Sequence, residues 1–338
     1  MDEKISIIVP AYNIAPYIES CVQTIRQQTY SNIEILLVDD GSTDGTGDIL
    51  DRIAAQDARV HIIHQKNGGV TKARFAGIKA ATGEWVGFVD GDDAIDPDMY
   101  ERLLDNARKY HADISHCGYQ MVFPSRVDYY YNTGRLILQD QATGLKDLLE
   151  GSFIEPGLWN KLFHKSLLQS LFHSGAMDES IKNTEDLLMN FYLFRNADKS
   201  VYEDFCPYHY LVRKGSAATS KVNEHKLRDP LLVLRKIKKQ TADDPVLKKA
   251  VDSRIIGALI GLSTMWLGDQ ANLILPYRTQ ARKELRAMIP QLLKDDYSIR
   301  TKFLSIWSAA WPWSYAVAHV IYSRIKGTYK KYEVSLQR

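Results

Sequence analysis

The first 90 residues alternate short apolar runs with stretches of helical periodicity, and this alternation constrains the fold more than any other feature. The apolar runs are rich in β-branched residues and nearly free of polar ones, as in strands buried on both faces. They span residues 5–9, 33–38, 60–64 and 85–89. Strands and helices in this order predict right-handed βαβ units, and therefore an α/β fold with a mostly parallel sheet and helices on both faces.

Polar clusters follow three of these strands: "PAYN" at 10–13, "DDGSTD" at 39–44 and "DGDD" at 90–93. The run at 60–64 is instead followed by "QKNGGVTKAR" (65–74), a glycine turn that opens a helix. Because ligands of open α/β sheets bind outside the carboxyl ends of the strands, we expect these clusters to meet in one crevice.

The stretch "GFVDGDDAID" (87–96) crowds four aspartates together without a lysine or arginine among them. Carboxylates this close repel one another unless something neutralises them. Asp90, Asp92 and Asp93 can bind a divalent cation that also holds a diphosphate, or they can simply form a turn. Asp96 is expected to cap the helix that follows Pro97.

Two further polar positions have a functional and a structural interpretation. One of Asp39 or Asp40 could accept a hydrogen bond from a nucleotide base, or the motif could be a turn and helix cap only. Arg74 is suited to a phosphate or to a pair of carboxylates, although an exposed, solvated arginine is the simpler alternative.

The length of 338 residues predicts one large and one smaller domain. The net charge of +2 argues against nucleic-acid binding. The three cysteines are far apart and lack CxxC spacing, which indicates a reduced, cytoplasmic chain without structural zinc. The N-terminal segment has two acids and a short apolar run, so we expect no signal peptide.

Four segments taken together resemble the family 2 glycosyltransferases, which have the nucleotide-sugar-binding GT-A (Rossmann-like) fold. They are "SIIVPAYN", "LLVDDGSTDGT", "NGGVTKARFAGIKAATGEWVGFVDGDD" and "TED", in this order. The most similar subgroup builds bacterial capsule, exopolysaccharide and teichoic-acid glycans. The resemblance is dense over residues 4–110, thinner to about 220 and absent beyond.

The resemblance implies a metal-dependent enzyme that takes a sugar from a UDP-sugar. The "DGD" segment matches the family's DxD motif, with Asp92 on Mn²⁺ or Mg²⁺, Asp90 towards ribose and donor sugar, and Asp93 extending the cluster. The other donor-binding residues that it implies are Pro10, Ala11, Tyr12, Asp40, Asn67 and Arg74. Phe75 stands where the family usually has asparagine, which puts a polar contact from that position in doubt.

The resemblance also implies an inverting single displacement, in which an acceptor hydroxyl attacks the anomeric carbon as UDP leaves. Asp186 in "TED" matches the family's catalytic base, and Glu185 beside it belongs to the acceptor side. We expect the dipole of the following helix to favour the ionised carboxylate, although both acids could merely complement that dipole. The transferred sugar would be a hexose or an N-acetylhexosamine.

Two later segments are candidates for acceptor binding and closure. In "LWNKLF", Trp159 could stack on a sugar and Lys161 could meet a hydroxyl or phosphate; alternatively, they are a buried anchor and a snorkelling lysine. In "YHYLVRKGSAATS" (208–220), Arg213 and Ser216 could belong to a lid over the diphosphate, or to an ordinary loop.

The C-terminal part reads as all-helical from about residue 225. Residues 303–322 contain no Asp, Glu, Lys or Arg and are basic on both sides, but Pro312 interrupts them. We therefore expect a broken helical pair resting on a membrane surface rather than a spanning helix. An ordinary helical subdomain or a subunit contact is the alternative.

The predicted organisation is thus a catalytic domain at 1–220 and a helical region at 225–338. Within the catalytic domain, 1–110 would bind the nucleotide sugar and 111–220 the acceptor. The expected acceptor is a glycan, such as a sugar on a polyprenyl diphosphate, and the expected location is the cytoplasm or the inner face of the membrane. A nucleotidyltransferase would need a Gly-rich, basic loop after the first strand, and a phosphoacceptor domain an acidic pair there, but the segment "PAYNIAPY" is neither. A lectin-like module would not need the metal-site acids and Asp186 together.

Overall fold

The computed structural model describes residues 3–130, 132–151, 153–172, 178, 180–213 and 220–325. The chain divides into two compact units, Met1–Val212 and Arg213–Arg338. Each is described by itself below.

The first unit is built on a single mixed sheet of ten strands, ordered β3-β2-β1-β4-β9-β6-β10-β5, with β7 beside β6 and β8 beside β10. The strands are β1 (Ile5–Ala11), β2 (Ile33–Asp39), β3 (Val60–His64), β4 (Trp85–Phe88), β5 (Ala94–Ile95), β6 (Ile114–Phe123), β7 (Arg126–Tyr129), β8 (Leu136–Asp140), β9 (Lys161–His164) and β10 (Lys199–Leu211). Neighbours among β1 to β4 are all parallel, and β9 is antiparallel to both β4 and β6. The predicted α/β fold class is confirmed.

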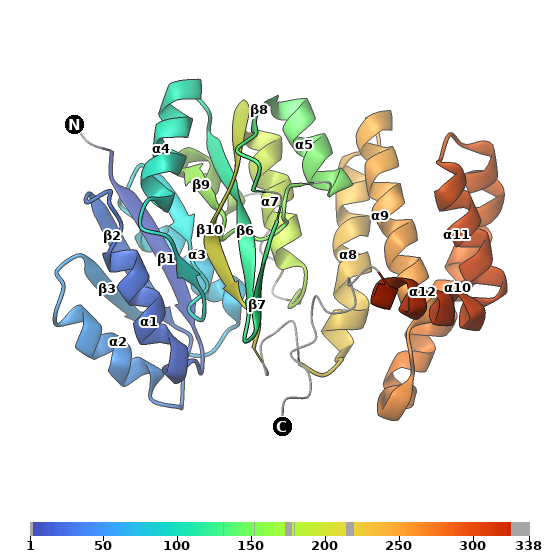
Figure 1. Ribbon diagram of the computed structural model, residues 1–338, viewed down its shortest axis with the longest axis horizontal. Helices are drawn as coiled ribbons and strands as arrows, with labels where there is room; N and C mark the ends of the chain where they lie inside the picture. The colour runs from blue at the N-terminus through green and yellow to red at the C-terminus, as the bar shows by residue number, and fades with distance from the viewer. Residues whose placement is uncertain are drawn as a thin grey trace. The chain divides into compact units, whose positions relative to one another are not determined.

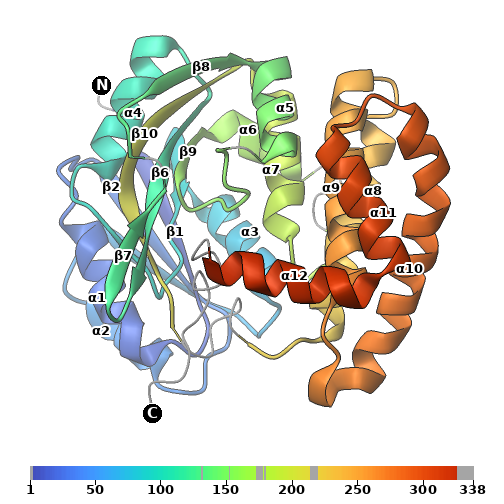
Figure 2. The same ribbon diagram turned by 45° about the vertical axis from the view of Figure 1, so that its right-hand side comes forward.

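Helices cover both faces of this sheet (Figures 1 and 2). They are α1 (Ala15–Arg26), α2 (Thr46–Ala54), α3 (Val70–Ala80), α4 (Met99–Tyr110), α5 (Gln141–Glu150), α6 (Lys165–Leu171) and α7 (Glu185–Asn196). On one face α3 packs so closely on β1 that a Cβ at Gly77 would lie 2.4 Å from the Ile8 side chain. On the other face α4 leaves room for no side chain at Gly87, where a Cβ would lie 2.4 Å from the Tyr100 ring.

The strand order explains where a ligand can bind. From β1 the chain moves outward through β2 to β3, and then returns to β4 on the other side of β1. This reversal leaves a crevice at the carboxyl ends of β1 and β4, which is the usual ligand site of such sheets. Residues 10–13 and 90–93 lie at those two ends, as the sequence predicted.

A strand occurs at each of the four early ranges expected, and helices lie between them. The structure differs from the sequence predictions at two places. Residues 208–211 end β10 rather than belonging to a loop. Asp96 does not cap α4, because Asp98 holds that position and the Asp96 carboxylate pairs with His209 instead.

The second unit is helical throughout its described residues. It contains α8 (Glu224–Gln240), α9 (Pro245–Thr264), a 3₁₀ turn η1 (Gly268–Gln270), α10 (Ala271–Lys294), α11 (Ile299–Ala310) and α12 (Pro312–Ile325). Helix α9 packs against α8, α10, α11 and α12. The helical segment is interrupted at Trp311, between α11 and α12. Pro312 is the first residue of α12, a position where the missing N–H of proline costs no helical hydrogen bond. The predicted break in the apolar segment is confirmed.

No single helix among the described residues is both long and apolar enough to cross a bilayer. Pro245–Thr264 and Gly268–Lys294 meet the length and composition criteria only as a pair, and the pair is bent by 98°.

The tight contact between α3 and β1 leads to a stability prediction. Gly77→Ala should lower the free energy of unfolding by about 1–3 kcal/mol, because the new methyl group must displace Ile8 in the core. Gly257→Ala in α9 is the matched control, since a Cβ there meets nothing within 4 Å. It should be neutral or stabilise by about 0.5–1 kcal/mol through helix propensity. Urea unfolding of both variants measures the difference, and equal effects would contradict the packing argument.

Candidate active site

A pocket of about 290 Å³ lies at the carboxyl ends of the first strands. Its lining is Pro10, Ala11, Tyr12, Asp40, Asn67, Gly69, Val70 and Ala73. Five of these are residues proposed from the sequence for nucleotide binding: Pro10, Ala11, Tyr12, Asp40 and Asn67. The structure therefore brings together residues from β1, from the loop after β2 and from the turn before α3. Tyr12 is half exposed at the pocket, so its ring is available to a ligand.

Asp40 holds the glycine turn that forms one wall of this pocket. Its Oδ1 accepts from Gln65 Nε2 at 2.7 Å and from Gly68 N at 2.8 Å, and its Oδ2 accepts from Gly69 N at 2.7 Å. Gly69 has φ of +92°, in a region that side chains disfavour, so glycine is needed there. Since each carboxylate oxygen has two lone pairs, these bonds leave one acceptor position on Oδ2.

Asp39, the other candidate in "DDGSTD", has a different task. It accepts from Ser42 N at 3.0 Å, and its other oxygen lies 3.0 Å from His64 Nδ1. These contacts brace the turn after β2 against the end of β3. Only Asp40 of the two lines the pocket.

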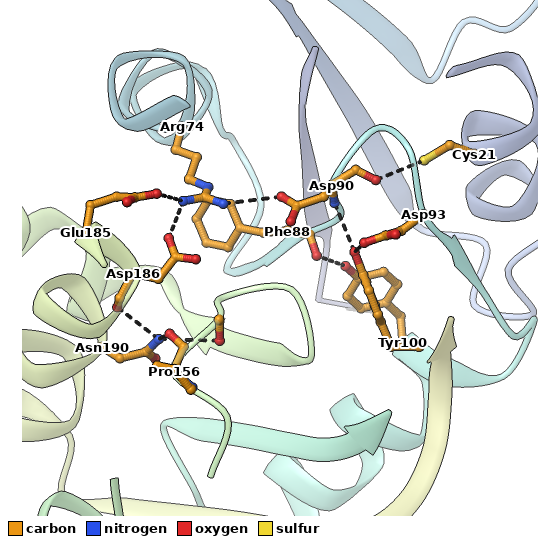
Figure 3. Close-up of polar contacts among 12 residues, drawn as sticks. Cys21, Arg74, Phe88, Asp90, Asp93, Tyr100, Pro156, Glu185, Asp186 and Asn190 are labelled. Atoms are coloured by element: carbon orange, nitrogen blue, oxygen red, sulfur yellow. Dashed lines mark hydrogen bonds and ion pairs between the residues drawn. The ribbon is translucent and has the colours of Figure 1, made fainter. Parts of the chain in front are cut away.

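Arg74 joins three carboxylates at the centre of the first unit (Figure 3). Its side chain is 4% exposed, and Nη2 donates to Asp90 at 3.2 Å while Nη1 donates to Glu185 at 3.2 Å and to Asp186. The partners come from the end of β4 and the first turn of α7, more than 90 residues apart in the chain. The exposed, solvated arginine considered from the sequence is ruled out. Its ε nitrogen is buried without a hydrogen-bond acceptor.

Burial dominates the proton affinities in this cluster. It raises the pKa of Asp186 to about 7, because the attraction of Arg74 only partly offsets desolvation and Glu185 adds repulsion. Burial likewise raises the pKa of Asp90 to about 6, against the attraction of Arg74 and with Asp186 and Asp92 adding repulsion. Desolvation of Asp186 therefore outweighs the favourable effect that was expected from the α7 dipole.

The start of α7 sets the direction of the two acids. Thr184 occupies the N-cap position with φ of +66°, a left-handed conformation that is strained for a β-branched residue. Its hydroxyl makes no capping bond and instead donates to Asn183 at 3.1 Å. From inside the helix Asn190 donates to Pro156 O at 2.5 Å and to Asp186 O at 3.2 Å.

The remaining aspartates of "DGDD" have separate environments. Asp93 is buried and accepts from Tyr208 Oη at 2.7 Å and from Leu211 N at 2.8 Å. Burial, with repulsion from Asp92 and Asp90, raises the pKa of Asp93 well above its usual range. Asp92 is half-buried. Within the part of the chain that the structure describes, no three His, Cys, Asp or Glu side chains are gathered as ligands of one ion.

Trp159 is buried, as expected for the anchoring residue considered as its structural alternative, and Lys161 is buried with it. The Trp159 ring is buried and stacks on Tyr208, with a centroid separation of 4.4 Å. Lys161 is fully buried and does not snorkel; Nζ donates to Glu155 O at 2.7 Å, Gly157 O at 2.6 Å and Asn160 Oδ1 at 2.8 Å. Burial lowers the pKa of Lys161 to about 8.

Three other residues from the sequence argument can be placed only in part. Phe75 is buried and meets Phe172 edge-on at 5.1 Å, an apolar contact in keeping with the doubt about a polar role. Arg213 is half-buried at the first position of the second unit. Ser216 lies outside the described residues, so the lid stays a prediction.

Sequence reasoning missed the residues that hold the acids in place. Tyr208 both accepts from Asp90 N at 3.1 Å and donates to Asp93, and Gln65 and Asn190 support Asp40 and Asp186. Tyr208 and Asp93 are 115 positions apart, so no local spacing connects them. The strand that carries Tyr208 also contains Tyr202 and Tyr210, so its composition did not single out this tyrosine.

Comparison with known proteins identifies the family of this chain. The family model "Glycosyl transferase family 2" matches residues 6–174, half of the chain. GlyG of Streptococcus pneumoniae, a glycosyltransferase, is 36% identical over 248 residues, which cover 70% of this chain and 80% of GlyG. The chain belongs to glycosyl transferase family 2. The family expected from the sequence motifs is therefore confirmed.

Two further known proteins, EpsJ and TarS, are similar to this family 2 chain. The "uncharacterized glycosyltransferase EpsJ" of Bacillus subtilis is 39% identical over 199 residues, covering 58% of this chain and 57% of EpsJ. The chain thus spans little more than half the length of that relative. The crystal structure of S. aureus TarS 1–349 in complex with UDP-GlcNAc superimposes with a TM-score of 0.65 at 20% identity, covering 96% of this chain and 92% of that one. At this identity the likeness shows the shared fold.

The Arg74 cluster makes stability depend on pH in a predictable direction. Asp90 and Asp186 bind protons more tightly in the folded state than their ordinary pKa of 3.8, so the free energy of unfolding falls as pH rises from about 4 to about 7. Without the cation their pKa values rise further. Arg74→Gln should therefore cost about 3–5 kcal/mol at pH 8 and clearly less at pH 5, where both acids are neutral.

Urea unfolding at the two pH values measures this effect. Arg52→Gln is the control, because Arg52 pairs with Glu19 at the surface with both side chains more than half exposed. It should change stability little, and equally at both pH values. A penalty for Arg74→Gln that does not grow with pH would refute the electrostatic account.

Proposed function

We propose that this enzyme is an inverting glycosyltransferase that moves a hexose or N-acetylhexosamine from a UDP-sugar to a glycan hydroxyl. The observation that carries the proposal is that one buried guanidinium, Arg74, binds both Asp90 and Asp186. An acid at the donor-side strand end and an acid suited to be the acceptor's base are thus held within the width of one side chain. A direct displacement needs this proximity.

The donor nucleotide is assigned to the pocket beside β1. Tyr12 offers a ring, Pro10 and Ala11 offer backbone, and Asp40 retains one lone pair that suits the N–H of a uracil. Asn67 lies at the same wall, towards the glycine turn. The TarS structure that shares this fold is a complex with UDP-GlcNAc, which supports a nucleotide-sugar donor.

The carboxylates beside the pocket fit a divalent cation such as Mn²⁺ or Mg²⁺, because hard oxygen donors are what these ions prefer. Asp92, half-buried and next to two acids of raised pKa, would hold the ion, with Asp90 beside it. With fewer than three protein ligands gathered among the described residues, the donor diphosphate and water would complete its coordination. When bound, the ion supplies positive charge against the charge that grows on the departing diphosphate.

Asp186 is assigned as the base. The acceptor oxygen forms its bond to the anomeric carbon while the bond from that carbon to the diphosphate breaks, and the hydroxyl proton passes to the Asp186 carboxylate. A pKa of about 7 makes Asp186 a stronger base than an ordinary carboxylate, but the base is available only when it is ionised. Arg74 holds its carboxylate in position, and Glu185 shares that cation from the acceptor side.

The acceptor is proposed to be a growing bacterial surface glycan, carried on a polyprenyl diphosphate. EpsJ and TarS resemble this chain, and the motif set is typical of capsule, exopolysaccharide and teichoic-acid enzymes. We assign catalysis to residues 1–220, with the nucleotide bound by 1–110 and the acceptor by 111–220. The reaction would then take place in the cytoplasm, at the inner face of the membrane.

The base is tested by comparing two neighbouring carboxylates that share Arg74. Asp186→Asn should bind UDP as the wild type does but lose at least about 100-fold in transfer, since no base remains to take the proton. Glu185→Gln removes the same charge from the same cation and should lose far less. UDP release across a panel of UDP-sugars gives the rate, and titration calorimetry gives UDP binding. Near-normal transfer by Asp186→Asn, or equal losses in both variants, would exclude Asp186 as the base.

The cation is tested by binding rather than by rate. UDP should bind more tightly with Mn²⁺ present than in chelator, and Asp92→Asn should remove most of that difference while leaving the metal-free affinity unchanged. Asp44→Asn serves as control, because Asp44 caps the turn before α2 through bonds to Thr46 and Ala15 and belongs to no carboxylate cluster. Metal-independent UDP binding by the wild type would contradict the proposal.

A further inference from the structure

Helix α11 in the second unit has an inverted distribution of side chains. Ser305, Ser308 and Ala309 are its buried residues, whereas Ile299, Phe303 and Ile306 are exposed. The exposed positions follow a spacing of three and four residues, so they form one stripe on the side away from the serines. A helix that faces water normally has the opposite arrangement.

The inward serines are compatible with this packing because each hydroxyl is satisfied within the helix. Ser305 Oγ donates to Thr301 O at 2.8 Å, and Ser308 Oγ donates to Ser305 O at 3.1 Å. Small residues also allow α11 to approach α9 and α10 closely. The large apolar side chains of α11 are therefore not needed for packing within the unit.

The neighbouring segment extends the apolar surface. Trp313, Val317 and Val320 are exposed at helical spacing along α12, and Trp311 is exposed at the break between the helices. We call the exposed apolar residues of 299–322 the apolar stripe; they are Ile299, Phe303, Ile306, Trp311, Trp313, Val317, Val320, Ile321 and Tyr322. Nine exposed apolar residues within one short segment, three of them phenylalanine or tryptophan, favour an apolar partner.

The charges around the stripe identify the kind of partner. Residues 299–325 contain Arg300, Lys302 and Arg324 but no aspartate or glutamate. In a symmetric dimer the stripe would face its own copy, and these cations would find no acids within it. An anionic lipid surface supplies both an apolar layer for the stripe and negative headgroups for its cations.

The lengths of the helices decide how they would sit. Twelve residues in α11 and fourteen in α12 correspond to about 18 and 21 Å, short of the roughly 30 Å of a hydrocarbon core. Tryptophan, abundant here, prefers the interface between headgroups and acyl chains. We infer that the α11–α12 segment docks in the plane of an anionic lipid interface, with the apolar stripe immersed and Arg300 and Lys302 at the headgroups.

This inference does not depend on the proposed reaction, and its test needs no substrate. The full chain is mixed with vesicles of phosphatidylcholine alone or with a third of phosphatidylglycerol, and the bound fraction is measured by flotation. Binding should require the anionic lipid and should weaken by about tenfold or more between 0.1 and 0.5 M NaCl. Absence of binding, or equal binding to both vesicles, would overturn the inference.

Two variants distinguish binding through the apolar stripe from nonspecific binding to vesicles. Phe303→Ser with Trp313→Ser removes side chains that are 58% and 73% exposed, and should reduce binding about tenfold or more without changing the thermal unfolding midpoint. Tyr129→Ser, at 57% exposed on β7 of the first unit, is the matched control and should leave binding unchanged. Unaltered binding by the double variant would refute the stripe as the contact.

The competing occupant, a second copy of the chain, gives a different result. Sedimentation of the wild type without lipid would show a concentration-dependent dimer that Phe303→Ser with Trp313→Ser dissociates. That outcome would overturn the assignment to a lipid surface. A monomer at all concentrations, together with anionic vesicle binding, supports it.

Discussion

The active-site region depends on one buried ion cluster. Arg74, on α3, binds carboxylates from the end of β4 and from the first turn of α7, so a single guanidinium fixes three elements of the first unit relative to one another. Three carboxylates and one cation leave excess negative charge in a region with little water, and proton affinity rises accordingly. The cluster is therefore both a positioning device and a place where charge is incompletely balanced. A cationic or proton-donating ligand would be stabilised there.

The acids of "DGDD" show how a protein can keep adjacent carboxylates without treating them alike. Asp90 is paired with Arg74, and Asp93 is held by Tyr208 and the backbone of Leu211. The sequence suggested that a cation must offset the repulsion among these carboxylates. Side chains and backbone of the protein itself provide part of that compensation. Tyr208, on β10, contacts both Asp90 and Asp93.

The two units show two uses of apolar surface. In the first, nearly continuous apolar strands are covered on both faces, and glycines such as Gly77 and Gly87 let helices approach closely. In the second, α11 turns its small residues inward and its large ones outward. Large apolar side chains thus form a closed core in the first unit and an exposed surface on α11, and the difference lies in which face of the helix packs.

The sequence by itself determined the α/β class, the early strands and helices, the family, and the residues around the pocket, because continuous apolar runs, period-3.6 patterns and turn residues act over a few positions. It also located the break at Pro312 for the same local reason. Only the tertiary structure decided that Arg74 neutralises Asp90 and Asp186, that Tyr208 holds Asp93, and that Lys161 is fully buried. These outcomes depend on burial and on partners up to 115 positions away, and neither the desolvation of a side chain nor a distant partner is encoded in local spacing.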